Sequence, residues 1–98
     1  MNDQILSDAA AAAEAIDLAY NQADFPTQMQ LKASRDAAFE AVASARAVSV
    51  GSQVTVTAGQ VAEMAGIRSE IEKAADAQTL IAGSAKFVAL LVKLAPVA

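Results

Sequence analysis

The carboxyl-terminal third of the chain carries a continuous row of apolar and small residues at alternating spacings of four and three. The row begins at Gln60 and continues to Ala95 without a break in the count. A repeat of about 3.5 residues is typical of an α-helix that packs one face against a partner helix. A second row joins the first in the last third and widens the apolar surface. The first row is Gln60, Met64, Ile67, Ile71, Ala74, Gln78, Ile81, Ala85, Val88, Val92 and Ala95, and the second is Leu80, Ser84, Phe87, Leu91 and Leu94.

Residues 58–95 can form one helix or two. A single helix over this whole range would be long for a chain of 98 residues. Asp76 with Thr79 can cap a new helix, and Gly83 weakens a helix interior. We therefore expect a bend or tight turn near Ala74–Thr79. The unbroken count of apolar positions favours the alternative of one continuous helix.

The first half of the chain predicts two more helices, at about Asp3–Gln22 and Gln28–Val48. Both ranges repeat apolar or small residues at helical spacing. Pro26 disfavours a helical conformation of the residue before it. Thr27 followed by Gln30 has the spacing of a capping box. The pattern therefore places a break before Thr27 and starts the second helix after it.

Residues 48–57 have a β-prone pattern. Val48, Val50, Val54 and Val56 alternate with polar residues around a glycine, as in a short β-hairpin. An isolated hairpin is marginal in water, so an extended loop on the bundle is an equal alternative. Thr57 with Gln60 repeats the capping pattern and starts the third helix.

Two groups of residues are candidates for contacts between helices of different chains. The second helix carries a seam of small residues, which we expect to face a neighbouring helix closely, so that Ala41→Leu would overpack it. The last helix is apolar around much of its circumference, more than alanine faces of one chain are expected to cover. The interface candidates are Ala38, Ala41, Ala45, Phe87, Leu90, Leu91 and Leu94.

Composition favours a single domain with a lean core. Of the 98 residues, 26 are alanine, three are Phe, one is Tyr and none is Trp. Alanine has the highest helix propensity but contributes little buried area. A chain of this kind gains stability when its alanine faces let helices approach closely, within one chain or between chains. We therefore expect self-association.

The residue inventory offers little for catalysis or for metal binding. The chain has no Cys and no His, which removes thiol nucleophiles and the commonest general base and zinc ligand. No glycine-rich phosphate loop and no loop of spaced Asp, Asn and Gly occurs. Neighbouring acids fall on helix faces that also carry Lys and Arg. We expect no enzyme activity, no catalytic residues, no cofactor, no metal and no small-molecule substrate.

The segment Gln60–Ile67 resembles the first half of a helix-turn-helix, with an alanine, a glycine four residues later and then an aliphatic residue. The resemblance departs at Glu72, where an aliphatic residue is usual. The segment that would read DNA, Arg68–Asp76, holds three acids and two bases, and phosphates repel acids. The net charge of −4 points the same way. We expect no nucleic-acid partner.

The segment from Thr79 to Ala98 is the most apolar, and its amphipathic surface could lie on a membrane. Lys86 and Lys93 interrupt it, so a transmembrane helix is not expected. The favoured interpretation is that this segment forms the main core. No secretory signal is evident, because acids stand where a basic region is usual. The localisation is unknown, with cytoplasmic as the default.

These observations predict an all-α fold, a single domain over 1–98 with three or four helices in an up-down bundle and a β-prone connector at about 48–57. The leading function is a non-catalytic interaction or structural protein that acts through helix–helix contacts, as a homo-oligomer or assembly subunit. The alternative is a small monomeric acidic adaptor or inhibitor that binds a larger protein through its first helix, which carries Asp3, Asp8, Glu14, Asp17 and Asp24.

Overall fold

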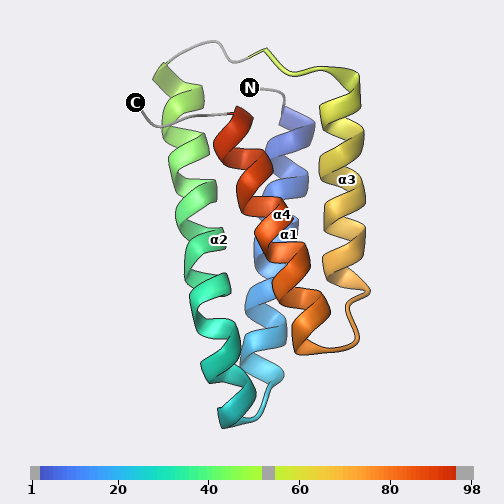
Figure 1. Ribbon diagram of the computed structural model, residues 1–98. Helices are drawn as coiled ribbons and strands as arrows, with labels where there is room; N and C mark the ends of the chain where they lie inside the picture. Colours follow the sequence, from blue (N-terminus) through green and yellow to red (C-terminus); the bar gives the residue numbers. More distant parts are fainter. Residues whose placement is uncertain (1–2, 52–54, 95–98) are drawn as a thin grey trace.

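The computed structural model describes residues 3–51 and 55–94, with the side chains of 49–51 left aside. It contains four helices, α1 (Asp3–Gln22), α2 (Phe25–Gly51), α3 (Ala58–Glu72) and α4 (Ala77–Leu94), arranged as a bundle (Figure 1). Successive helices run in alternating directions along the bundle. The prediction of an all-α helical bundle is confirmed, and no strand occurs within the described residues.

Each helix has two main neighbours. α1 packs against α2 and α3, and α4 packs against the same two helices, while α1 and α4 touch across the centre. In the described part of the chain, α2 and α3 make no contact. The two helices therefore lie at opposite corners of the bundle (Figure 1). As a result, α1 and α3 form a parallel pair on one face, and α2 and α4 form a parallel pair on the opposite face.

The core is built from few large side chains and many alanines. Phe87 of α4 is fully buried and is the largest such side chain among the described residues. On α1 the buried positions between Ile5 and Ile16 are alanines and Asp8. The distance between packed helices depends on the size of the side chains at the contact. Small side chains therefore let α1 approach the other helices closely. The other large, fully buried apolar residues are Ile5, Ile16, Leu31, Met64 and Leu91.

The expected turn between the third and fourth helices is present at residues 73–76, and it changes which row of α4 is buried. The row of Leu80, Phe87 and Leu91 lies in the core. The other row continues the count from α3, but Val88 is only half-buried and Val92 is exposed. The turn changes the rotation of α4 about its own axis. The spacing of apolar positions counted through α3 therefore does not predict which side of α4 faces the core. The single seam predicted over Gln60–Ala95 is therefore wrong beyond the turn.

The boundaries of α2 differ from the prediction at both ends. Asp24 caps the helix, because its Oδ1 accepts a hydrogen bond of 3.0 Å from the Thr27 N–H. Pro26 lies in the first turn, where its missing N–H has no helical partner to lose, so Phe25 is helical after all. The predicted start at Gln28 is three residues too late.

At its other end α2 continues through Gly51, so residues 48–51 are helical. The hairpin alternative for 48–57 is therefore wrong at its first strand. Val48 packs against the core, and helix propagation from an alanine-rich segment outweighs the weak β preference of valine. Val54 lies outside the described residues. Val56 is partly buried against the core.

Three helix starts are fixed by side-chain caps. Thr57 and Gln60 form the predicted capping box of α3, with reciprocal hydrogen bonds of 2.9 and 3.1 Å. At α4 the Asp76 Oδ1 accepts a hydrogen bond of 2.8 Å from the Thr79 N–H, as the sequence also predicted. Hydrogen bonds from Thr79 lower the pKa of Asp76 below its ordinary value, and hydrogen bonds from Thr27 lower the pKa of Asp24.

The two carboxylate caps predict acid sensitivity. A carboxylate with a lowered folded-state pKa stabilises the fold above its unfolded pKa of about 3.9, and this contribution is lost as the pH falls through the folded value. We expect the melting temperature to fall as the pH drops below about 4. The double variant Asp24→Asn and Asp76→Asn keeps both acceptors but does not titrate there, so its decline should be shallower. Circular-dichroism melts across this pH range give the melting temperatures of the parent and of the double variant. If both melting temperatures fell equally steeply with pH, this would contradict a role of the caps.

Candidate interaction surfaces

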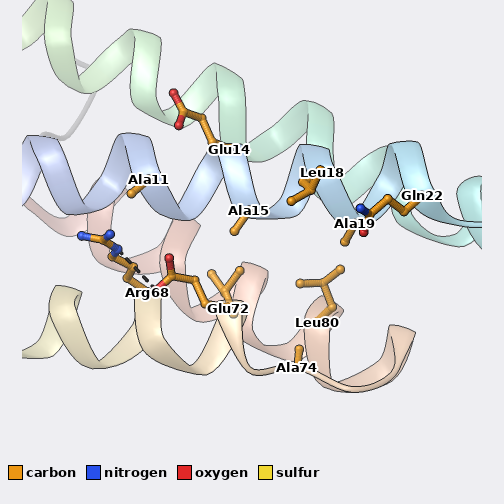
Figure 2. A pocket seen from close by; sticks show the side chains of 11 residues that line it. Ala11, Glu14, Ala15, Leu18, Ala19, Gln22, Arg68, Glu72, Ala74 and Leu80 are labelled. Carbon is orange, nitrogen blue, oxygen red and sulfur yellow. Dashed lines mark ion pairs between the residues drawn. The ribbon is translucent and has the colours of Figure 1, made fainter.

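An open groove of about 570 Å³ lies between α1 and α3, near the start of α4. Figure 2 shows alanines of α1 on one side of it and Arg68 with Glu72 of α3 on the other. Leu18, which lines this groove, is 57% exposed. The lining residues are Ala11, Glu14, Ala15, Leu18, Ala19, Gln22, Arg68, Ile71, Glu72, Ala74 and Leu80.

The cation of this groove is already engaged. Arg68 donates from Nη1 to the Asp8 carboxylate at 2.8 Å, and its Nε lies 3.4 Å from Glu72 Oε1. The Asp8 side chain is only 5% exposed and also accepts a hydrogen bond from Gln4 at 3.2 Å. A buried carboxylate needs such partners. The Asp8–Arg68 pair therefore ties α1 to α3, and Arg68 is not a free group for an anionic ligand.

A second ion pair ties α1 to α2. Arg35 Nε donates to Asp17 Oδ1 at 2.7 Å, and its guanidinium lies 4.7 Å from the centroid of the Tyr20 ring, within the range of a cation–π contact. With Asp8 paired to Arg68 and Asp24 capping α2, three of the five acids of the first helix and the turn after it have partners inside the chain. Asp3, Glu14 and Asp24 are exposed, so these three carboxylates remain on the surface of α1 and of the turn after it.

The opposite side of the bundle, which we name the α2–α4 face, is apolar. Two shallow hollows of about 440 and 240 Å³ adjoin along it. Val92 is 54% exposed here, and Ala85 and Ala89 are exposed beside it. Among the described residues that line these hollows, Glu40 is the only charged one. The lining residues are Ala33, Ser34, Ala37, Glu40, Ala41 and Ser44 of α2, and Ile81, Ser84, Ala85, Val88, Ala89, Leu91 and Val92 of α4.

The structure places most of the predicted interface candidates in the core of the single chain. Six are buried, and Leu90, at 5% exposure, lies beside Ile67 of α3. Ala41 alone is partly exposed, on the α2–α4 face. The buried alanines of the seam, Ala38 and Ala45, face the interior of the bundle. The buried six are Ala38, Ala45, Phe87, Leu90, Leu91 and Leu94.

The sequence did not single out the residues of this face, because they stand directly beside buried residues of the same kind. Ala37 is one residue before the buried Ala38, and Val88 is one residue after the buried Phe87. A step of one residue turns the side chain by about 100° around the helix. The double apolar row of α4 indicated that part of this helix would stay uncovered, but the sequence pattern alone does not tell which row that is.

Two other expectations have structural outcomes. The segment Gln60–Ile67 lies inside the unbroken helix α3, with Gly66 in mid-helix, so the helix-turn-helix resemblance is not matched by a turn. By length and composition alone, α4 is apolar enough to cross a membrane; core helices of soluble bundles share this property, and α4 buries Phe87 here. Within residues 3–51 and 55–94, no group of three or more acids is arranged to hold a metal ion.

Comparisons with protein families, with curated proteins and with solved structures find no match to this chain. Function therefore has to be argued from the two surfaces themselves. The groove between α1 and α3 is rimmed by charged and amide side chains, and its arginine is engaged. The α2–α4 face is continuous and almost uncharged.

Proposed function

We propose that this protein is a non-catalytic interaction protein that associates with itself through helix–helix contacts of the α2–α4 face. The observation that carries the proposal is the exposed apolar strip on two parallel helices, which includes Val92, Ala85 and Ala89. Contiguous apolar surface of this kind on a small soluble protein marks an interaction site. Leu90, Leu91 and Leu94 are buried on one side of α4. The strip is the apolar part of α4 that stays exposed on the other side.

The residue sizes on the face suit another helix better than a small molecule. Alanine and serine on both helices leave shallow depressions between ridges, and helices pack by placing the ridges of one into the grooves of the other. A small-molecule site is usually a concave pocket with a few convergent polar groups. Here the two hollows are open and their polar atoms are those of serines and one glutamate.

The chemistry of the chain supports a role without catalysis. Its sequence contains neither His nor Cys. Asp8 and Asp17 are held in ion pairs between helices, and Asp24 and Asp76 cap helices. Each of these four carboxylates thus has a structural partner, so the acids favour a stabilising role over acid–base chemistry.

Val92→Glu tests the proposal. Each copy in an assembly would bring a charge into the apolar contact, where an unpaired charge is costly, so we expect the assembled fraction to fall at least tenfold at a given concentration. The helical signal should be unchanged, because Val92 is exposed in the single chain. Light scattering over a range of concentrations measures the mass, and circular dichroism measures the helix content.

Ala65→Glu is the matched control, because it adds the same charge at an exposed alanine on α3. It should assemble like the parent. A parent that stays monomeric at every concentration would overturn the proposal, and so would a Val92→Glu variant that keeps the parent's mass.

A further inference from the structure

The two edges of the α2–α4 face carry opposite charges. On the α2 edge, Glu40 lines the face beside Ala41. On the α4 edge, Lys86 and Lys93 border Ala89, in a hollow that Glu63 and Glu70 of α3 also line. Lys86 pairs with Glu70 of α3 at 3.1 Å, at an exposed site. Neither Glu40 nor Lys93 makes an ion pair within the described part of the chain.

These charges lie at matching heights along the bundle. Glu40 lines the same hollow as Val88 and Val92. On α4, that level falls between Lys86 and Lys93, which are two turns apart on the same edge. Because α2 and α4 run parallel (Figure 1), a two-fold axis parallel to the helices leaves these heights unchanged. It also lays α2 of one copy over α4 of the other.

We propose that the partner of the α2–α4 face is a second copy of this chain in a parallel two-fold dimer, with Glu40 of each copy opposite Lys86 and Lys93 of the other. This inference rests on the proposed function and adds the partner's orientation. The antiparallel two-fold arrangement places α2 on α2 and α4 on α4, so that like charges meet along each edge, which disfavours it. In the parallel arrangement both edges are complementary.

The size of the face limits the area that the dimer can bury. The 18 residues of α4 span about 27 Å at 1.5 Å per residue, and two helices side by side are about 20 Å wide. The projected face is therefore about 540 Å² per copy, below the roughly 800 Å² per partner of a standard stable interface. Small interfaces are typical of weak, transient association, so the dimer should dissociate into monomers on dilution.

Charge exchange tests the orientation. Glu40→Lys and Lys93→Glu each replace attraction by repulsion at both edges of a parallel dimer, and we expect each to weaken dimerisation by about tenfold at low ionic strength. The double variant should recover to within about threefold of the parent, because it exchanges the signs. Sedimentation equilibrium measures the dissociation constants. High salt should reduce the differences, since the charges are at the rim.

The absence of cysteine from the sequence permits a direct geometric test. Ala37→Cys on α2, labelled with ¹⁵N, is mixed with unlabelled Ala85→Cys on α4, and a short bismaleimide links cysteines that lie close together. Both positions line the same hollow. The parallel dimer predicts mainly mixed products by mass spectrometry. Ala62→Cys, exposed on α3, is the control and should link with neither.

The outcomes separate the two proposals. Mixed cross-links with recovery in the double variant support the parallel dimer. Predominant links between two Ala37→Cys chains, or a double variant no better than the single ones, overturn the orientation while self-association stands. A parent that remains monomeric throughout overturns both proposals.

Discussion

Phe87→Ala is expected to lower the free energy of unfolding by about 3–5 kcal/mol, the usual cost of truncating a buried aromatic residue. Phe87 has no exposed surface. The cost is large here because the neighbouring core is rich in alanine, and small side chains cannot move far enough to fill the space. A loss of this size approaches the whole stability of a small domain, which is about 5–15 kcal/mol. Urea unfolding followed by circular dichroism measures it.

The chain supplies its own control. Phe25 is 71% exposed, so Phe25→Ala removes the same side chain from a place where it buries little. We expect this variant to lie within about 0.5 kcal/mol of the parent. If both variants lost the same stability, Phe87 could not be the centre of the core. The comparison assumes two-state unfolding. A free energy of unfolding that falls linearly with urea concentration, with the same slope for both variants and the parent, would support it.

Helix ends fixed by local chemistry could be predicted from the sequence. The range Asp3–Gln22 of α1 matches the structure, and the Thr57–Gln60 capping box starts α3. Asp76 caps α4. Each of these signals is complete within four residues, so no knowledge of the rest of the chain is needed. The start of α2 was missed because Asp24 caps it one turn before the pattern at Thr27 that suggested a different cap.

The burial of α4 could not be predicted because it depends on packing between helices. Both rows of this helix are apolar, and the rotation of α4 after the turn decides which of them faces the core. Gly83 contributes to that rotation. A Cβ atom at this position would lie 3.0 Å from Ile71 Cγ1, so the glycine lets α3 and α4 approach closely. The sequence indicates only that a glycine weakens a helix.

The sequence predicted surfaces for helix–helix contacts, and six of its seven candidate residues are buried in the single chain rather than exposed on the proposed α2–α4 face. Small residues on α2 and a widened apolar surface on α4 pointed to helix–helix contacts. The buried and exposed alanines of α2 share the same residue type and the same spacing, so composition cannot separate them. Ala38 is buried and Ala37 is half-buried on the α2–α4 face. Ala37 and Ala38 differ in burial because of where α1 and α4 lie around α2.

A leucine series along α2 tests that separation. Ala38 has no exposed surface, so Ala38→Leu must push its neighbours apart, and we expect it to cost about 1–3 kcal/mol of unfolding free energy. Ala41 borders an open hollow of about 240 Å³ beside Val92, where a leucine side chain has room. Ala41→Leu should therefore change stability little, contrary to the expectation from the sequence. Ala43 is exposed, and Ala43→Leu serves as the reference for the effect of leucine on the helix itself.

Urea unfolding of the three variants, at a concentration where the parent is monomeric, gives the comparison. The expected order of stability loss is Ala38→Leu far above Ala41→Leu, with Ala41→Leu close to Ala43→Leu. The reverse order, with Ala41→Leu the most destabilised, would mean that α2 is rotated by about 60° from the position described, since three residues along a helix differ by that angle. Ala41 would then belong to the core, and the α2–α4 face would lose the small residues on which the proposed dimer depends.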